Sequence, residues 1–388
     1  MTSKKTVYIL CGTSANLNRK LAGLTIGERL LLALSYSSAD EAAFIGDGPR
    51  PQSARATIPV REATAEEFSN EKDVIVLPSD LVFDRNLLRN DDGLKGGLPL
   101  CTISASEIEK SIENIDHLLT TLGAGEALSG KDYAIRVTDD VTAKLAKRAL
   151  FLSLIKPIDG FISKTINRKV SLAITRLLIH TPVSPNGLTV AIMLLGVLSG
   201  VAAYFAEYWW SLAIAGFLFQ TQSMLDGCDG EIARLKYQFS VKGQWLDSIG
   251  DDITNYIFCL GLALGQARVL GWDWLYYVGA AVFVIQWYCS TLMYQRIYKM
   301  NTGDLLAIPN MVSSGEPKGR WGVIVRVIHT MTKRDFFVFV TSIFAAAQLP
   351  LVSFILIAAG SCIMAPSLTL NEFRIRKAIR AGELNIPL

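Results

Sequence analysis

Six apolar segments follow one another in the second half of the chain, and they constrain its fold more than any other feature. The first, at residues 188–206, is about long enough to cross a bilayer. The others occupy residues 209–225, 245–265, 274–294, 336–349 and 351–365. Tryptophan and tyrosine gather at several of their ends, as they do at membrane interfaces. The pattern predicts an all-α membrane domain of six transmembrane helices over residues 185–388, with a short fifth span and a break at Leu349–Pro350.

Basic residues between these segments predict their orientation. One side of the predicted membrane receives nearly all of the Lys and Arg, whereas the short loops on the opposite side contain only Arg268. Because cytoplasmic loops carry the excess of basic residues, we expect both termini in the cytoplasm. The sequence therefore predicts an integral protein of the cytoplasmic (inner) membrane, in contact with membrane lipid.

Residues 141–184 are predicted to form a linker with an amphipathic helix ahead of the first span. Five apolar residues fall on one helical face, with basic residues elsewhere: Ile162, Ile166, Val170, Ala173 and Leu177. Such a helix lies in the cytoplasmic interface of a membrane. A soluble connecting helix remains the alternative.

Residues 1–140 show a different pattern, in which strands alternate with helices. Three short apolar runs end in turn residues, as buried parallel strands do: residues 6–12, 41–46 and 73–80. Residues 26–37 have helical spacing, and residues 106–122 repeat Ile and Leu at three- and four-residue steps. The alternation predicts a Rossmann-like, three-layer α/β domain on the cytoplasmic side.

The overall composition limits the chemistry of the chain. A net charge of +3 over 388 residues is too small to indicate binding of nucleic acid. The six cysteines show no CxxC spacing and the three histidines are far apart, which argues against a zinc site or a disulfide framework.

Carboxylates cluster where the third apolar segment begins, at Asp226, Asp229, Asp247, Asp251 and Asp252. On helices, Asp226 and Asp229 share a face, and Asp247 and Asp251 form a stripe with Gly243. Carboxylates that converge at a membrane boundary repel one another unless they bind cations. Oxygen-only ligands suit Mg²⁺, Mn²⁺ or Ca²⁺ and disfavour zinc. A divalent-cation transporter and a solvated acidic loop are alternative readings of these carboxylates.

The same stretch matches the signature of the CDP-alcohol phosphotransferase family at eight positions, Asp226-x2-Asp229-Gly230-x2-Ala233-Arg234-x8-Gly243-x3-Asp247-x3-Asp251. The resemblance covers roughly residues 150–380. Members of this family transfer a phosphoalcohol group from a CDP-linked donor to an acceptor hydroxyl and release CMP. The resemblance implies a CDP-alcohol donor, an alcohol or phosphoalcohol acceptor, a homodimer, and a role in phospholipid or phosphodiester biosynthesis.

The resemblance also implies a role for each residue of the signature. Asp226, Asp229, Asp247 and Asp251 resemble ligands of two divalent cations, Mg²⁺ or Mn²⁺, and Ca²⁺ also fits such a site. Asp251 is further expected to be the general base that takes the proton of the acceptor hydroxyl. Four residues are expected to bind the nucleotide: Gly230, Ala233, Arg234 and Gly243.

Residues outside the signature extend the predicted site. Asn186 and Thr189 are similar to the Pro-Asn-x-x-Thr pattern of the family and could bind the donor phosphates, but Asn186 is equally well placed as a helix N-cap. Basic residues at the cytoplasmic ends of the fourth and fifth spans predict a clamp for a phosphorylated acceptor: Arg334, Lys333, Arg296 and Lys299. The alternative is that these residues only anchor the topology.

The N-terminal domain resembles sugar-phosphate nucleotidyltransferases over residues 7–34 and 74–88, with Asp80 at their metal-binding position. Its fusion to the membrane domain resembles the bifunctional inositol-phosphate cytidylyltransferase and di-myo-inositol phosphate phosphate synthases. A phosphate loop needs glycines, yet residues 11–20 contain only Gly12, with Arg19 and Lys20 still able to meet phosphate. We therefore favour a degenerate domain with a structural, docking or regulatory role over an active cytidylyltransferase.

Overall fold

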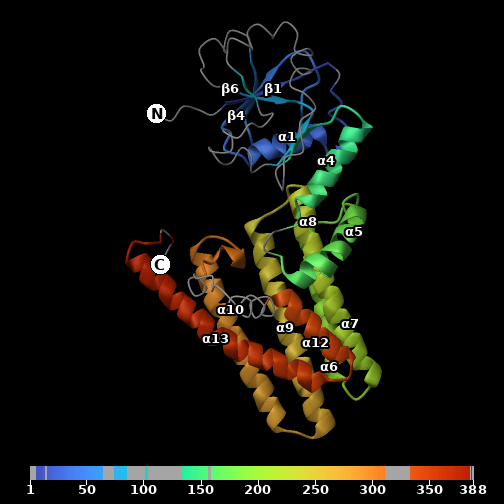
Figure 1. The fold of residues 1–388 in the computed structure, drawn as a ribbon, viewed down its shortest axis with the longest axis vertical. Helices are drawn as coiled ribbons and strands as arrows, with labels where there is room; N and C mark the ends of the chain where they lie inside the picture. Colours follow the sequence, from blue (N-terminus) through green and yellow to red (C-terminus); the bar gives the residue numbers. More distant parts are fainter. Residues whose placement is uncertain are drawn as a thin grey trace, which may run out of the picture. The chain divides into compact units, whose positions relative to one another are not determined.

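The computed structural model divides the chain into two compact units (Figure 1). The first unit holds Met1–Lys156 together with Leu235–Tyr237, and the second holds Pro157–Arg234 together with Gln238–Leu388. The structure describes residues 6–13, 15–63, 74–84, 101–103, 133–155, 159–310, 333–384 and 386. Within these residues the strands belong to the first unit, and the second unit is helical.

A five-stranded sheet forms the first unit, in the order β5-β4-β1-β6-β8. Its strands are β1 Thr6–Leu10, β4 Glu41–Ile45, β5 Val60–Glu62, β6 Val74–Pro78 and β8 Cys101–Ile103. β1 pairs in parallel with β4 and β6, and β4 pairs in parallel with β5, whereas β8 runs antiparallel to β6. The three predicted strands are therefore β1, β4 and β6, and the predicted parallel sheet is confirmed.

A capped helix connects the two central strands. α1, Ile26–Ser35, begins at Thr25, whose hydroxyl accepts from the Glu28 amide while the Glu28 carboxylate accepts from the Thr25 amide. The smaller elements of this unit are β2 Lys20–Leu21, β3 Leu24–Thr25, β7 Leu81–Phe83, β9 Ala134–Arg136 and α4 Asp140–Leu152. The helix predicted at residues 106–122 lies outside the described residues.

Each of the six apolar segments forms a helix of the second unit. These are α6 Pro185–Tyr204, α7 Trp209–Leu225, α9 Val241–Leu270, α10 Trp274–Lys299, α12 Arg334–Ala346 and α13 Pro350–Arg380. Among the described residues, α6, α9, α10 and α13 are long and apolar enough to cross a membrane. α7 has 17 residues and α12 has 13, so six spans remain a prediction, whereas the predicted break before Pro350 is confirmed.

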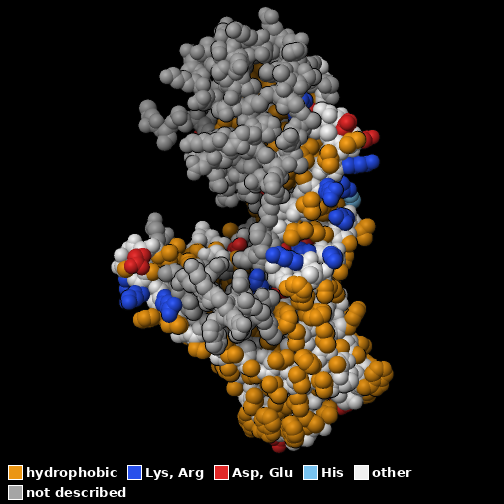
Figure 2. Space-filling model, viewed as in Figure 1, with side chains coloured by type: hydrophobic (Ala, Val, Ile, Leu, Met, Phe, Trp, Pro, Cys, Tyr) orange, Lys and Arg blue, Asp and Glu red, His pale blue; other side chains and the backbone are white. Residues whose placement is uncertain are grey.

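Apolar side chains cover the surface of these helices in Figure 2. On α6, Leu194 and Leu198 are each 53% exposed, although a water-soluble helix would turn such residues inward. A broad apolar surface of this kind is expected of helices that face lipid.

Close packing of α6 against α9 brings the polar ends of the two helices together. A Cβ atom added to Gly261 of α9 would lie 2.1 Å from the carbonyl oxygen of Gly200 on α6, so only glycine permits this approach. Small residues at such crossings let two helix backbones come close. The crossing places Thr189 of α6 beside the acidic half of α9, where the candidate site lies.

The predicted amphipathic helix is present, but it is built in two parts. A π-helical turn, η5 Ser163–Asn167, leads into α5 Arg168–Leu178. Ser171 and Thr175 are buried, whereas Leu177 on the predicted apolar face is 75% exposed. The polar side of α5 therefore packs against protein and part of its apolar side faces outward, and its place in a membrane interface stays a prediction.

Candidate metal and substrate site

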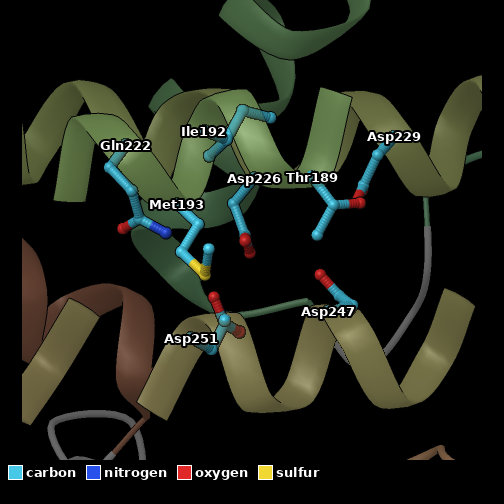
Figure 3. Close-up of a pocket in the computed structure, with 9 residues that line it drawn as sticks. Thr189, Ile192, Met193, Gln222, Asp226, Asp229, Asp247 and Asp251 are labelled. Atoms are coloured by element: carbon cyan, nitrogen blue, oxygen red, sulfur yellow. The ribbon is translucent and has the colours of Figure 1, made fainter. Parts of the chain in front are cut away.

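A pocket in the second unit collects residues from four helical elements (Figure 3). α6 contributes Thr189, Ile192 and Met193; α7 contributes Gln222 and its C-cap residue Asp226; and the short helix α8, Gly227–Leu235, contributes Asp229. α9 contributes Asp247, Gly250 and Asp251. The carboxylates and Thr189 make one part of the pocket polar, and Ile192, Met193 and Gly250 line an apolar part.

Three carboxylates of this pocket point toward one another (Figure 3). Asp226, Asp247 and Asp251 each offer one oxygen atom, and these atoms all lie within 4.8 Å of one another. All three residues are partly buried, so water screens their mutual repulsion only in part. The oxygen-only donor set fits a hard divalent cation such as Mg²⁺ or Mn²⁺.

Asp229 lies in the same pocket but has partners of its own. Its Oδ2 accepts a hydrogen bond from the Thr189 hydroxyl, and its Oδ1 accepts from the Gly230 amide. Burial, together with repulsion from Asp226, raises the pKa of Asp229 to about 6, and the hydrogen bond from Thr189 counteracts part of this increase. Thr189 therefore orients Asp229, and the predicted contact of Thr189 with a donor phosphate stays a prediction.

Arg334 reaches the carboxylates from the first turn of α12. Its Nη1 donates to Asp251 Oδ2 and lies 3.3 Å from Asp226 Oδ2, and its Nη2 lies 2.5 Å from Asp251 Oδ1. The sequence placed Arg334 in the acceptor clamp, and the structure places its guanidinium directly on two of the predicted metal ligands.

The other three residues of the predicted clamp do not line the described pocket. Arg296 is 2% exposed and forms an ion pair with Glu372 of α13, with Nε 3.0 Å from Oε2. Lys299 is exposed at the end of α10, and Lys333 is the N-cap residue of α12. A contact of these side chains with an acceptor stays a prediction.

The residues predicted to bind the nucleotide lie on α8 and at the start of α9. A Cβ atom at Gly230 would meet nothing closer than Arg234 Nη1 at 3.8 Å, so this face of α8 is open. A Cβ atom at Gly243 would lie 3.0 Å from Asn186 Oδ1, so Gly243 lets the starts of α6 and α9 approach. Ala233 is buried.

The N-cap of α6 is not Asn186, although the sequence offered that role as an alternative. Ser184 is the N-cap, since its hydroxyl accepts from the Gly187 amide at 3.2 Å, and Pro185 occupies the first helical turn. The N-cap assignment of Asn186 was therefore wrong, because proline is favoured at the first helical position and serine is favoured just before it. Asn186 is exposed and stays a candidate for the donor phosphates.

A buried acidic residue that sequence reasoning missed joins α5 to α8. Glu231 is fully buried and accepts hydrogen bonds from Ser171 Oγ and Thr175 Oγ1, each at 2.7 Å. Arg168 Nη1 lies 2.8 Å from the same carboxylate, and its Nε lies 2.9 Å from Asp159 Oδ2. The signal was available in the sequence, since Arg168, Ser171 and Thr175 recur at helical spacing on the side of α5 opposite its apolar face.

Two further polar residues lie near the pocket: Asp252, which the sequence placed among the clustered carboxylates without a specific role, and Gln222, which sequence reasoning missed. Asp252 Oδ2 accepts from the Tyr294 hydroxyl of α10 at 2.5 Å and from the Tyr256 hydroxyl at 3.4 Å, which ties α9 to α10 beside Asp251. Gln222 is buried in the pocket wall, and its Oε1 has no hydrogen-bond partner among the described residues.

Asp80, the predicted metal ligand of the N-terminal domain, forms an ion pair with Arg136. Both oxygens of Asp80 accept from Arg136, at 3.0 and 3.1 Å, and the side chains are 7% and 11% exposed. Arg19, which the sequence places in the loop at residues 11–20, pairs with Asp140 at 2.5 Å. An arginine side chain therefore neutralises the carboxylate that would hold a metal in a nucleotidyltransferase.

Comparison with known proteins adds independent information on the helical unit. Residues 182–365 match the model of the CDP-alcohol phosphatidyltransferase family. A protein of Aquifex aeolicus named "Bifunctional IPC transferase and DIPP synthase" is 42% identical over 139 residues, which are 36% of this chain and 31% of that protein. A protein of Archaeoglobus fulgidus with the same name is 42% identical over 120 residues, which are 31% of this chain and 23% of that protein.

A longer match is found with the protein of that name from Rubrobacter xylanophilus, at 32% identity over 198 residues. It covers 48% of this chain and 44% of the relative, so each of these alignments spans less than half of the relative's length. The family match includes the eight signature positions and the helices that form the pocket. Residues 182–365 are therefore a domain of the CDP-alcohol phosphatidyltransferase family.

Proposed function

We propose that the chain catalyses the metal-dependent transfer of a phosphoalcohol group from a CDP-linked donor to an acceptor hydroxyl, with release of CMP. The carrying observation is that Asp226, Asp247 and Asp251 bring oxygen atoms within 4.8 Å of one another, inside a domain of this family. The family match also favours a transferase over the cation transporter that the carboxylates alone would allow.

The carboxylates would hold two divalent cations, Mg²⁺ or Mn²⁺. Asp226, Asp247 and Asp251 supply the converging oxygens, and Asp229 would join them through a carboxylate that Thr189 orients. When bound, such cations neutralise the donor diphosphate and stabilise the negative charge on the departing CMP. The carboxylates of the pocket would repel the negatively charged diphosphate of the donor, so donor binding should require the cations.

Asp251 would act as the general base. The acceptor oxygen attacks the phosphorus atom next to the alcohol, the bond from that phosphorus to the oxygen of CMP breaks, and CMP leaves with the electron pair. Asp251 takes the proton from the acceptor hydroxyl, and its place on α9 beside the apolar part of the pocket limits the access of water. Arg334 has to leave Asp251 for this step, because its fork engages both oxygens of that carboxylate.

The open face of α8 would bind the nucleotide. Gly230 leaves space in which cytidine and its phosphates can approach the backbone, and Arg234 lies beside that space. The proposed nucleotide site is completed by Ala233 on α8, Gly243 at the start of α9 and Asn186 at the start of α6.

The acceptor is proposed to be an inositol phosphate or a related phosphoalcohol. The relatives are named IPC transferase and DIPP synthase, which suggests inositol-based substrates on both sides of the reaction. Lys333 and Arg334 lie at the start of α12, where Arg334 contacts the carboxylates. The planar fork of an arginine suits a phosphate group. Arg296 and Lys299 would contribute positive charge from the end of α10.

Six helices would span the inner membrane with both termini in the cytoplasm, as a homodimer. α7 and α12 are shorter than the other four, and a short span can tilt less or thin the bilayer around it. The N-terminal unit would be a degenerate nucleotidyltransferase-like domain, because Arg136 already neutralises Asp80.

The test is CMP release by the full chain in detergent, with a panel that includes CDP-inositol and CDP-diacylglycerol as donors and inositol phosphate as an acceptor. CMP should appear only with a CDP-alcohol and Mg²⁺ or Mn²⁺, and chelation by EDTA should abolish it. Movement of Mn²⁺ into proteoliposomes without any CMP release would instead establish the transporter.

A further inference from the structure

Arg334 uses the same oxygen atoms that a divalent cation would need. Its fork engages both oxygens of Asp251, and its Nη1 also lies 3.3 Å from Asp226 Oδ2. Asp226 and Asp251 are two of the three carboxylates whose oxygens converge. A divalent ion coordinated by these oxygens would lie next to the guanidinium, where two positive charges repel strongly in a partly buried site. The two cations are therefore alternatives for one pair of carboxylates.

The backbone that carries Arg334 is held in place, whereas its side chain is only partly buried. Asp335 Oδ2 accepts from the Ser163 amide at 2.7 Å, which fixes the start of α12 to η5. A Cβ atom at Gly160 would lie 2.1 Å from Asp335 Oδ1, so this contact is tight. The Arg334 side chain is 37% exposed, in contrast to the buried Arg296 at the end of α10. With the start of α12 held in this way, an exchange of partners by Arg334 would occur by rotation of its side chain.

We propose that Arg334 is an exchangeable counter-charge: a divalent cation displaces its guanidinium from Asp226 and Asp251, and the displaced guanidinium becomes the group that binds the phosphate of the acceptor. The inference rests on the proposed function and adds an order of binding to it, in which the cation binds before the phosphate of the acceptor. Cation binding and phosphate binding then support each other. The cation takes the carboxylates and leaves the guanidinium for phosphate, whereas phosphate takes the guanidinium and leaves the carboxylates for the cation. Until the cation arrives, Arg334 supplies one positive charge to this pocket of carboxylates, and it contacts two of them, Asp226 and Asp251.

The first measurement is Mn²⁺ binding by the full-length chain in detergent, by isothermal titration calorimetry. Arg334→Gln should bind Mn²⁺ about tenfold more tightly than the unmodified chain, because the competing charge-assisted hydrogen bonds are gone. Lys333→Gln removes the same charge from the neighbouring residue and should change the affinity by no more than about threefold. Arg334→Lys keeps the charge without the planar fork, so its Mn²⁺ affinity should lie between those of the unmodified chain and Arg334→Gln.

The second measurement is the affinity for inorganic phosphate with and without Mn²⁺. Mn²⁺ should increase phosphate affinity more in the unmodified chain than in Arg334→Gln, where only direct contact of phosphate with the metal remains. An unchanged or weaker Mn²⁺ affinity in Arg334→Gln, or an equal gain in Lys333→Gln, would overturn the exchange and leave the proposed function intact. Absence of Mn²⁺ binding in the unmodified chain would instead count against the proposed function itself.

Discussion

Arg168 of α5 and Glu231 of α8 form an ion pair with Nη1 2.8 Å from Oε1, and the Glu231 side chain is fully buried. This pair attaches the amphipathic helix to the short helix that carries Asp229. Because Glu231 also accepts from Ser171 and Thr175, one carboxylate satisfies three donors from a single face of α5. The position of Asp229 therefore depends on contacts with α5, a helix outside the signature.

Glu231→Ala should strongly destabilise the protein. The substitution leaves Arg168 with only Asp159 among these acidic partners and two buried hydroxyls without their acceptor, a loss of about 3–5 kcal/mol. Thermal unfolding in detergent measures the effect. Glu207→Ala is the matched control, since Glu207 pairs with Arg268 where both side chains are about one-third exposed, at 37% and 33%, and should cost less than about 1 kcal/mol. Equal losses in the two variants would contradict the structural role of Glu231.

Asp251→Asn should lower turnover far more than donor binding, because asparagine keeps an oxygen that can bind a cation but cannot take the acceptor proton. Loss of the general base alone is expected to lower the rate by about 10²–10⁴-fold. Asp226→Asn should weaken the binding of metal and donor about as much as it lowers the rate, because Asp226 supplies a converging oxygen but is proposed to take no proton. The rate of CMP release and the Mn²⁺-dependent binding of CDP separate the two effects. If both variants lost CDP binding equally, the proposed division of roles would be wrong.

Thr189→Val should weaken Mn²⁺ and donor binding by about tenfold. The valine keeps the shape of threonine but removes the hydroxyl that donates to Asp229, and a hydrogen bond to a charged group contributes about 1.5–3 kcal/mol. Thr189→Ser retains the hydroxyl and should restore most of the affinity. Calorimetric titration with Mn²⁺ measures the difference. A serine variant as weak as the valine variant would indicate that the methyl group, and not the hydroxyl, is what matters.

The N-terminal unit should not make a CDP-alcohol. Asp80 is paired through both oxygens with Arg136, and Arg19 is engaged by Asp140, so neither residue is placed to hold a nucleoside triphosphate with its metal. The full chain given CTP, Mg²⁺ and inositol phosphate is expected to release no pyrophosphate above background. The same preparation should release CMP from a preformed CDP-alcohol, which serves as the positive control. Pyrophosphate release would show that the chain makes its own donor.

The positions of the helices and the carboxylate stripe could be predicted from the sequence because they depend on local periodicity. The apolar runs correspond to α6, α7, α9, α10, α12 and α13, and the four-residue spacing of Asp247 and Asp251 places both on one side of α9. The three strands β1, β4 and β6 were predictable for the same reason, since short buried strands have their own pattern.

The partners of each charge were decided by tertiary structure. Arg334 is separated from Asp251 by 83 residues, and no local pattern distinguishes an arginine that binds acceptor phosphate from one that binds those carboxylates. Glu231 occupies an unspecified position between two residues of the signature, and only the packing of α5 places two hydroxyls and Arg168 against it. Asp80 kept the residue type of a metal ligand, but the antiparallel pairing of β7 with β9 brings Arg136 onto its carboxylate. Backbone periodicity repeats over a few residues, whereas the choice of a counter-charge depends on which distant helices and strands pack together.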